Sequence, residues 1–310
     1  MTDAFQTVET DAEPEADPVA SMLAVLDLTG SDARTTEDIF TGVSQRMPLG
    51  RVYGGQVLAQ SIVAASRTLP ENRSVHSMHG YFLRPGDASK GITFAVDRIH
   101  DGRSFSTRRT QAFQEGVPIF SMIASFQDED PGLDHQEPMP EGVPAPEDLP
   151  DIEAQLEGLH PMTKRLFLDR PADLRHVPSP IYLTADEEAT PRQAVWMKVR
   201  RPIGDDPDLH RAALAYLSDL TIQESILRAH GLAWATPGLK VASLDHAMWW
   251  HRAGRVDEWM LYVQESPSAR GGRGLSSGRI YSRDGVLLAS VAQEIMVRVP
   301  DGVRLADQPR

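Results

Sequence analysis

Alternating runs of apolar and polar residues divide the first half of the chain into one helix and four strands. The segment Gln56–Leu69 carries apolar residues at helical spacing, opens after Gly54-Gly55 and stops at Pro70. Glycine, proline and aspartate pairs break the following residues into pieces of strand length. The predicted strands are Ser74–Leu83, Ile92–His100, Ser104–Glu115 and Pro118–Gln127. This half therefore predicts one long helix followed by antiparallel hairpins.

The second half of the chain predicts the same plan. The residues Thr221-Ile222-Gln223-Glu224 form a capping-box pattern that predicts a helix start, and Gly231 is placed to end that helix. The predicted strands of this half are Gln193–Arg200, Lys240–Trp250, Trp259–Ser266, Gly278–Ser282 and Val286–Val297. A long helix with several antiparallel strands, present twice, predicts an α+β fold in which a curved sheet wraps each helix.

Two short motifs recur in the same order and indicate a duplicated fold. The run Tyr81-Phe82-Leu83-Arg84-Pro85-Gly86 has a counterpart in Trp249-Trp250-His251-Arg252-Ala253-Gly254. Further on, Glu115-Gly116-Val117-Pro118-Ile119-Phe120 corresponds to Asp284-Gly285-Val286-Leu287-Leu288-Ala289. Gly116 lies 32 positions after Arg84, and Gly285 lies 33 positions after Arg252. Two copies would meet at a pseudo-symmetric interface, where a site can form.

Composition divides the 310 residues into two folded units and three acidic or short connecting segments. The predicted division is a disordered acidic tail (1–20), a first domain (21–127), an acidic proline-rich linker (128–165), a second domain with the chemistry (166–300) and a tail (301–310). Residues 1–20 hold six acids and residues 128–157 hold eleven, with no lysine or arginine in either stretch. The net charge of −13 therefore belongs to these segments, and the folded remainder is slightly basic.

Several protein classes and locations have no support in the sequence. No apolar run approaches the ~18 residues of a membrane span, and the N-terminus lacks a secretory pattern. The final residues carry no recognised peroxisomal signal. The absence of cysteine removes disulfides, thiolate nucleophiles and cysteine zinc sites. Phosphate-binding loops, dinucleotide-binding motifs and dense basic patches are also missing. We therefore expect a cytoplasmic protein with no cofactor and no nucleic-acid or membrane partner.

Two patterns imitate active-site motifs but lack the context that their chemistry needs. Gly274-Leu275-Ser276-Ser277-Gly278 fits a nucleophile elbow, yet glycine and arginine precede it and a strand-like segment follows. The pairs His76 with His79 and His246 with His251 suggest a metal site. Residues three apart do not share a strand face, however, and no carboxylate cluster accompanies these histidines. We interpret the serine as a loop residue and the histidines as core or surface residues, and expect no metal.

Seven segments between about residues 35 and 300 resemble a known family. They are Gly54-Gly55-Gln56, His76–Asp87, Asp101–Arg109, Ala124-Ser125-Phe126-Gln127, Ser218-Asp219-Leu220, Leu244–Trp249 and Asp284–Leu287. These long, specific motifs closely resemble the type II acyl-CoA thioesterases (the TesB-like family). The resemblance implies a double hotdog fold, with two tandem hotdog units. It also implies a catalytic triad of Asp, Thr or Ser, and Gln, which falls on Asp219, Ser243 and Gln293.

The implied reaction is hydrolysis of medium- or long-chain acyl-CoA to free fatty acid and CoA. Asp219 would accept a proton from a water that Ser243 and Gln293 orient toward the thioester carbonyl, without a covalent intermediate. The backbone N–H groups of Gly55 and Gln56, at the start of the first helix, are the predicted oxyanion donors. Asp219 is expected just before a helix, where the positive helix end makes a carboxylate a weaker base. The alternative for Asp219 is a structural N-cap.

Other functions and partners stay open at this stage. A hotdog hydratase acting on enoyl-CoA and a non-catalytic acyl-CoA sensor are alternatives, although the Asp-x-Asn-Pro-x-His signature of the hydratases is missing. The stretches Arg103–Arg109 and Arg270–Arg279 are either candidates for binding the CoA phosphates or solvated strand faces. Family members often associate, which implies a homodimer or homotetramer. The first copy has Ala124 in place of Gln293 and Ser77 near the position of Ser243, so we expect one active site per chain.

Overall fold

In the first half of the chain, the described residues form two helices and six strands. A computed structural model describes residues 17–31, 36–47, 50–70, 72–152, 156, 170–177, 179–303 and 305–306. The elements of this half are α1 (Pro18–Leu26), β1 (Thr29–Gly30), β2 (Asp38–Gly42), α2 (Gly54–Ser66), β3 (Arg73–Phe82), β4 (Ile92–Asp101), β5 (Phe105–Gln114) and β6 (Val117–Asp128). The helix and the four strands predicted here are confirmed to within a few residues.

The second half repeats the order of helix and strands, with additions. Its elements are a 3₁₀ turn (Pro146–Asp148), β7 (Ala172–Val177), β8 (Arg192–Val199), α5 (Pro207–Ser218), α6 (Glu224–Ala229), β9 (Lys240–Ser243), β10 (Asp245–Trp250), β11 (Met260–Arg270), β12 (Arg273–Ser282) and β13 (Leu287–Arg298). The predicted strand over residues 240–250 is interrupted at Leu244. The other four strands predicted in this half are confirmed, although β12 begins five residues before the predicted Gly278.

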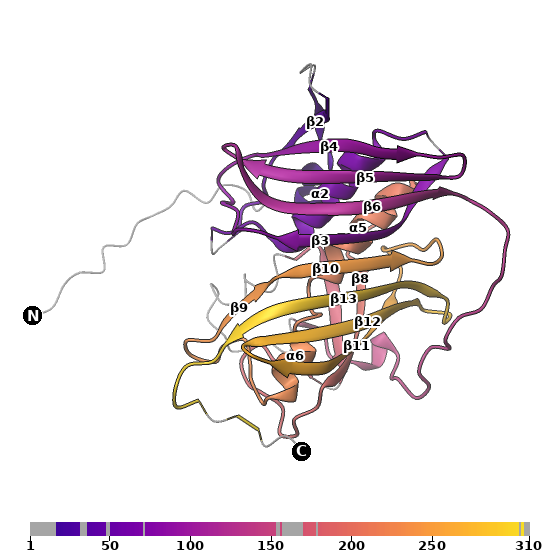
Figure 1. The fold of residues 1–310 in the computed structure, drawn as a ribbon. Coiled ribbons are helices and arrows are strands. Elements are labelled where there is room, and N and C mark those ends of the chain that lie inside the picture. Colours follow the sequence, from indigo (N-terminus) through magenta and orange to yellow (C-terminus); the bar gives the residue numbers. More distant parts are fainter. Residues whose placement is uncertain are drawn as a thin grey trace, which may run out of the picture.

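The strands of the described residues form one continuous antiparallel sheet (Figure 1). Its order is β1-β2-β4-β5-β6-β3-β10-β13-β12-β11-β8-β7, and β9 also pairs with β13. From the centre outward, the first half contributes β3-β6-β5-β4-β2-β1 and the second contributes β10-β13-β12-β11-β8-β7. The halves join where β3 and β10 pair, with Met78 opposite Met248. This matched order confirms the α+β double hotdog.

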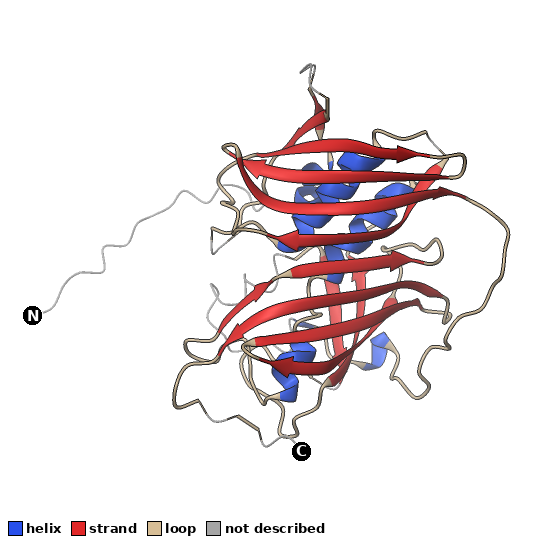
Figure 2. Ribbon diagram, viewed as in Figure 1, coloured by secondary structure: helices blue, strands red, loops and turns tan. Residues whose placement is uncertain are grey.

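Helices α2 and α5 lie behind the sheet and form the hydrophobic core with it (Figure 2). Leu58 and Ile62 of α2 and Leu217 of α5 are fully buried in one cluster with Phe94 and Phe120 of the sheet. Helix α2 packs against β3, β4, β5 and β6 of its own half and against α5, while α5 packs against α2 and lies beside β3 of the first half. This packing brings the end of α5 next to the start of α2.

The long helix of the second half is α5, so its predicted position after Thr221 is wrong. Both groups of the expected capping box have other partners. The hydroxyl of Thr221 accepts a hydrogen bond from Gln264 Nε2 at 2.7 Å. Glu224 accepts one from Trp234 Nε1 at 3.1 Å and pairs with His176. A helix does form there, as predicted, and Gly231 follows its end with a positive φ, but α6 has only six residues.

The sequence does contain a start signal for α5. Asp206 accepts the backbone N–H of Asp208 at 2.9 Å, and Pro207 occupies the first helical position. The aspartate satisfies one of the unpaired N–H groups of the first turn, and proline has no N–H to leave unpaired. The pair Asp206-Pro207 is thus the helix signal that the prediction missed.

The described part of the acidic linker packs along the second half and runs down the right side of Figure 1. Glu137 pairs with Arg279 at 2.8 Å, and Glu147 pairs with Arg283 at 2.7 Å. The carbonyl of Pro144 accepts a hydrogen bond from Trp196 Nε1 at 2.8 Å. These contacts attach the linker to the outer strands, so its negative charge partly neutralises arginines of the second half.

The two acidic segments lie partly outside the described residues. Positions 1–16 of the predicted tail and 157–165 of the linker are among those not described. The predicted boundary at residue 20 falls inside α1, where Asp17 accepts the N–H of Val19 at 3.0 Å. Among the helices that the structure describes, none has both the length and the apolar character to cross a bilayer.

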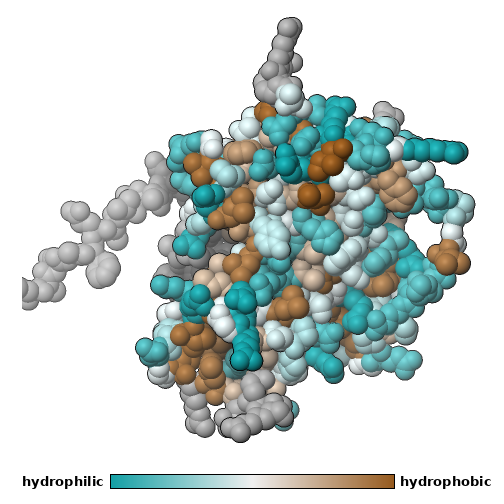
Figure 3. Space-filling view, viewed as in Figure 1, coloured by the Kyte–Doolittle hydropathy of each residue, from teal (hydrophilic) through white to brown (hydrophobic). Residues whose placement is uncertain are grey.

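The outer face of the sheet is open and mixed in character. Tyr81, Ile123 and Trp249 are among its exposed large apolar side chains. Figure 3 shows the apolar areas of this face as small patches separated by polar surface. The face turned toward the helices is more apolar, although β5 also buries Ser106, Arg108 and Thr110 there.

Candidate active site

The three residues of the predicted triad lie in one hydrogen-bonded cluster in the second half. Asp219 directly follows α5, Ser243 ends β9 and Gln293 lies within β13. Gln293 Nε2 donates to Asp219 Oδ1 and to Ser243 Oγ, both at 2.9 Å. Asp219 and Gln293 are buried, whereas Ser243 is half-buried. The side of the cluster that Ser243 occupies is therefore the more open to a ligand.

The first half contributes the start of α2 to this cluster. The backbone N–H of Gly55 donates to Asp219 Oδ2 at 2.9 Å. A Cβ on Gly54 would lie 2.6 Å from Asp219 Oδ2, and a Cβ on Gly55 would overlap the carbonyl oxygen of Tyr216. The pair Gly54-Gly55 thus permits the close approach of the two helices. The carboxylate and the helix start come from opposite copies, as the sequence predicts.

The predicted oxyanion donors have acceptors in this structure. Gly55 N–H is directed at Asp219, and Gln56 N–H reaches the carbonyl of Tyr53 at 3.2 Å. A substrate oxygen would have to replace one of these acceptors to receive the same N–H group. The oxyanion role of Gly55 and Gln56 therefore stays a prediction.

Asp219 lies at the end of a helix and not before one, which corrects the expected electrostatics. It is the C-cap of α5, and the helix start that it meets belongs to α2. Burial raises the pKa of Asp219 to about 6, and hydrogen bonds from Gln293, Gly55 and Gln223 oppose that rise. The expected weaker base is therefore wrong in direction, because desolvation outweighs the helix end and makes Asp219 a stronger base.

Three tyrosines surround Asp219 and fix the end of α5. Tyr53 OH donates to the carbonyl of Tyr216 at 2.8 Å, and Tyr262 OH donates to the carbonyl of Ser218 at 3.1 Å. These bonds satisfy carbonyl groups that a helix end leaves unpaired. Burial raises the pKa of Tyr53, Tyr216 and Tyr262, so all three stay neutral at physiological pH. Their rings also exclude water from one side of the carboxylate.

Gln223 is a further member of the cluster that the sequence reasoning missed. Its Nε2 donates to Ser243 Oγ at 3.1 Å, and its side chain also hydrogen-bonds the carboxylate of Asp219. Gln223 and Gln293 therefore each span the hydroxyl and the carboxylate. The signal available was the position of Gln223, four residues after Asp219, on the first turn that follows α5.

His246 is the second residue that was missed. Its Nδ1 hydrogen-bonds Gln293 Oε1, and its Nε2 lies 3.0 Å from Ser218 Oγ. From the sequence, His246 is interpreted as a core or surface residue, and regular strand alternation would place it on the face opposite Ser243, three residues earlier. That alternation fails here because the chain leaves β9 and enters β10 at Leu244. The break turns both side chains toward the same cluster.

The motifs that imitate active sites do not form them. Ser276 lies in the middle of β12, buried, with its Oγ 2.8 Å from Ser225 Oγ, and a strand follows where a nucleophile elbow has a helix. It is thus a strand residue and not the predicted loop serine. His76 bonds Ser125 at 2.8 Å, and His251 bonds Ser290 at 2.9 Å. Across the described ranges, no three metal-binding side chains lie close enough together to hold an ion.

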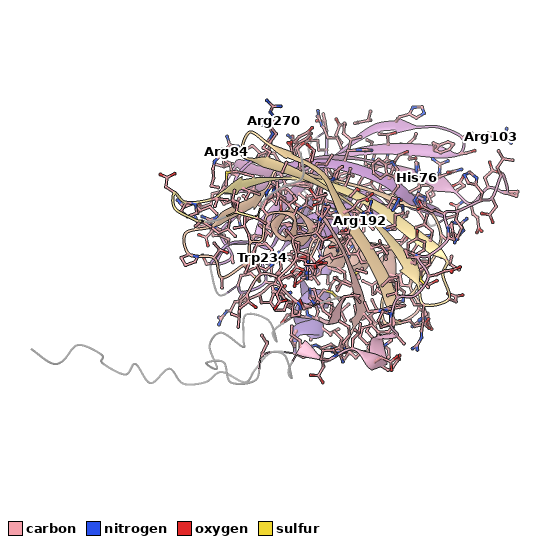
Figure 4. The ribbon with its side chains drawn as sticks, turned by 90° about the horizontal axis from the view of Figure 1, so that it is seen from below. His76, Arg84, Arg103, Arg192, Trp234 and Arg270 are labelled. Atoms are coloured by element: carbon pink, nitrogen blue, oxygen red, sulfur yellow. The ribbon has the colours of Figure 1, made fainter. Side chains whose placement is uncertain are left out.

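The two arginine-rich stretches do not converge on one site. Arg108 is fully buried and pairs with Asp101 at 2.7 Å, and Arg279 pairs with Glu137. Arg103 and Arg270 project from opposite sides of the molecule (Figure 4). Some arginines of these stretches therefore stabilise the fold, and the two stretches together do not make a single phosphate clamp.

Comparisons with known proteins agree with this architecture. Residues 172–296 match the acyl-CoA thioesterase family, and residues 43–127 match the acyl-CoA thioesterase N-terminal domain. Human acyl-coenzyme A thioesterase 8 is 39% identical over 277 residues, which are 85% of this chain and 85% of that protein. Acyl-CoA thioesterase 2 of Haemophilus influenzae is 36% identical over 267 residues, or 84% of this chain and 92% of that protein.

A solved structure extends the similarity to three dimensions. The acyl-CoA thioesterase II TesB2 from Mycobacterium marinum is 44% identical, with a TM-score of 0.73, and the match covers 91% of this chain and 100% of that chain. Fold and matches together define a double-hotdog enzyme that hydrolyses acyl-CoA thioesters. The chain belongs to the type II acyl-CoA thioesterase (TesB-like) family. The family recognised from the sequence motifs is thereby confirmed.

Proposed function

We propose that this thioesterase converts medium- or long-chain acyl-CoA to free fatty acid and CoA through Asp219, Ser243 and Gln293. The observation that carries the proposal is the position of Gln293 Nε2, which lies 2.9 Å from both Asp219 Oδ1 and Ser243 Oγ. Three residues that are distant in the chain thus form one hydrogen-bonded polar cluster. A base, a hydroxyl and an amide so arranged can hold one water molecule beside a thioester.

Asp219 acts as the general base in this proposal. A carboxyl with a pKa of about 6 is charged at neutral pH and accepts a proton more readily than an ordinary aspartate. It removes a proton from water while the water oxygen bonds to the carbonyl carbon. The carbon–sulfur bond then breaks, and the CoA thiolate takes the proton back from Asp219. Attack by water needs no covalent intermediate because a thioester is more electrophilic than an oxygen ester.

Ser243 supplies the oriented hydrogen-bond donor. Its Oγ accepts from Gln293 at 2.9 Å and from Gln223 at 3.1 Å, which occupies both lone pairs. The hydroxyl hydrogen is then left to donate to the water or to the substrate oxygen. The amide groups of Gln223 and Gln293 donate to Ser243 Oγ and accept nothing from it. They therefore determine the direction in which the hydroxyl hydrogen points. Serine in place of the family's frequent threonine keeps the hydroxyl on which this role depends.

Thiol release measures the activity directly. The chain has no cysteine, so a thiol reagent reports only the CoA that is released. We expect Asp219→Asn to lower kcat by about 10³-fold, since a positioned general base contributes ~10²–10⁴-fold. Asp205→Asn, which changes an exposed aspartate paired with Arg255, is the matched control and should keep wild-type activity. Equal kcat values for Asp219→Asn and the wild type would contradict the proposed mechanism.

The acyl chain-length range is the finer part of the proposal. Rates measured with acyl-CoA substrates of increasing length should peak at medium or long chains, and a maximum at acetyl-CoA would contradict this. An acyl-CoA sensor would bind the same substrates without releasing thiol, and a hydratase would consume enoyl-CoA without releasing it. Family membership in the thioester hydrolases favours hydrolysis. The homodimer or homotetramer and the cytoplasmic location stay predictions.

A further inference from the structure

The imidazole of His246 is fully buried between the end of α5 and the catalytic amide. His246 lies on β10 with none of its surface exposed. Its Nε2 is 3.0 Å from the hydroxyl of Ser218, the residue before Asp219. Its Nδ1 contacts Gln293 Oε1. The ring therefore has two polar partners and reaches neither the surface nor Asp219 itself.

Donor and acceptor roles along this chain of contacts follow from the charge of Asp219. A charged carboxylate only accepts hydrogen bonds, so the end of Gln293 that faces Asp219 is its NH₂ group. Oε1 consequently faces His246 and requires a donor, which places a proton on Nδ1. Burial lowers the pKa of His246 to about 4, so the ring is neutral and its Nε2 is an acceptor. The hydroxyl of Ser218 lies 3.0 Å from this nitrogen and 2.8 Å from the carbonyl of Ala215, so its one hydrogen is shared between two acceptors. The reverse orientation of the amide would direct Oε1 at the carboxylate.

The first copy provides an internal comparison for this pair. In β3 and β6, Met78 lies opposite Ala124, one step beyond His79 and Ile123. In β10 and β13, Ala247 lies opposite Ala292, and His246 and Gln293 occupy the next position along these two paired strands. Met78 and Ala124 are both buried and apolar. The copy that has no glutamine at this position therefore has no histidine beside it either.

We propose that His246 is a positioning residue that holds the amide of Gln293 in the one orientation that can donate to Asp219 and Ser243. The inference rests on the proposed function, in which Gln293 orients the reacting groups. Without His246, Gln293 could rotate its amide or move toward the vacated space. The donors to Asp219 and Ser243 would then be lost for part of the time. The expected consequence is a slower chemical step with little change in substrate binding.

Two substitutions separate this role from simple packing. His246→Met introduces the residue that the first copy buries at the same position, and it removes the donor. We expect kcat to fall by about 10–100-fold with KM nearly unchanged, the range usual for residues that orient a catalytic group. His246→Asn places an amide NH₂ near the position of Nδ1 and should recover most of the lost kcat. Wild-type kcat for His246→Met, or no recovery with His246→Asn, would overturn the proposal.

A double-mutant cycle tests whether His246 acts through Gln293. Gln293→Ala alone and the double variant Gln293→Ala/His246→Met should have equal kcat, because the histidine has nothing left to orient. Multiplied losses would show an independent, structural effect and overturn the proposal. If Asp219→Asn keeps full activity, the proposed mechanism fails whatever the histidine variants do, so the two failures are distinguishable.

The tautomer of His246 gives a test that needs no variant. ¹⁵N spectroscopy of the wild-type protein between pH 6 and 8 should find His246 protonated at Nδ1 and unprotonated at Nε2. A ring protonated at Nε2 alone could not donate to Gln293 Oε1 and would overturn the proposal, even if His246→Met did not fold.

Discussion

The two halves of the molecule share one scaffold and differ in the few positions that surround the site. Ser243 lies opposite Ile295 in the second copy, and Val75 lies opposite Phe126 in the first. Val75 and not Ser77 therefore corresponds to Ser243, while the predicted correspondence of Ala124 to Gln293 is confirmed by the register. The first copy has Arg67 where the second has Asp219, and Val75 where the second has Ser243. It has Met78 in place of His246 and Ala124 in place of Gln293.

The starts of α2 and α5 also differ, and in this case the first copy is the one that contributes to the site. Helix α2 begins with Gly54-Gly55, has no side-chain cap, and directs the Gly55 N–H at Asp219. Helix α5 begins with Asp206 and Pro207, which cap the first turn and remove an N–H group. Of these two helices, only α2 therefore offers its positive end to a carboxylate of the other copy. The second copy carries the side chains, the first supplies the helix start, and the comparison predicts a single site per chain.

The sharpest way to break this comparison is to give the second copy a residue of the first. Ser243→Val introduces the counterpart of Val75 and removes the donor hydroxyl, and valine has the same shape as the threonine of the control variant below. We expect kcat to fall by about 100-fold, close to the ~10²–10³-fold cost of removing one positioned donor. Ser243→Thr, which keeps the hydroxyl, is the control and should retain most of the activity. Comparable thiol release from the valine and threonine variants would contradict the role of the hydroxyl.

The contribution of the first copy is tested at Gly55. In Gly55→Ala the added Cβ would overlap the Tyr216 carbonyl and lie 2.6 Å from the Tyr53 ring, so α2 must move away from α5. We expect about a 10-fold loss of kcat and a destabilisation of ~1–3 kcal/mol from overpacking. This outweighs the helix propensity of up to ~1 kcal/mol that alanine gains over glycine.

The matched control for Gly55→Ala is Gly132→Ala. Gly132 lies in the linker, and a Cβ there would meet no atom within 4 Å. Thermal unfolding and thiol release measured side by side should show no change for Gly132→Ala. An unchanged melting temperature and kcat for Gly55→Ala would mean that the start of α2 is not needed at the site.

Most of the fold could be predicted because its strands are long and alternate regularly. The hairpins of the first half follow from breaks such as Asp101-Gly102 and Glu115-Gly116, and at the second of these both residues adopt the positive φ of a tight turn. The position of α5 could not be read in the same way. Nearly all of its residues from Ala212 to Ser218 are buried, so it has no polar stripe to reveal helical spacing.

The site was predicted only as far as family motifs reach. Asp219, Ser243 and Gln293 lie at a helix end, a strand end and a strand centre, and no sequence spacing connects such positions. Gln223 and His246 join them through a turn after α5 and a break between β9 and β10. Both are departures from regular geometry, which periodicity rules do not describe. Tertiary packing, and not local pattern, completes the cluster.

The smallest expected effect concerns the pH dependence of kcat/KM, which arises from Asp219 in the second copy. The general base must be charged, so kcat/KM should fall tenfold per pH unit below about pH 6, the pKa of Asp219, and be constant above it. The neighbouring tyrosines stay neutral in this range because burial raises the pKa of each. His246 stays neutral because burial lowers its pKa to about 4. The acid limb of the pH profile, which is the fall in kcat/KM at low pH, therefore reports the protonation of Asp219.

Gln223 allows this acid limb to be moved while Asp219, Ser243 and Gln293 are all kept. Its hydrogen bond lowers the pKa of Asp219, so Gln223→Leu should raise that pKa and shift the limb to higher pH by less than about one unit, or ~1.4 kcal/mol. Gln223→Glu places a second carboxylate beside Asp219 and should shift the limb further in the same direction. The measurement is kcat/KM from pH 4.5 to 8, compared with the wild type. A limb that stays in place in both variants, or moves to lower pH, would show that Gln223 does not act on the base.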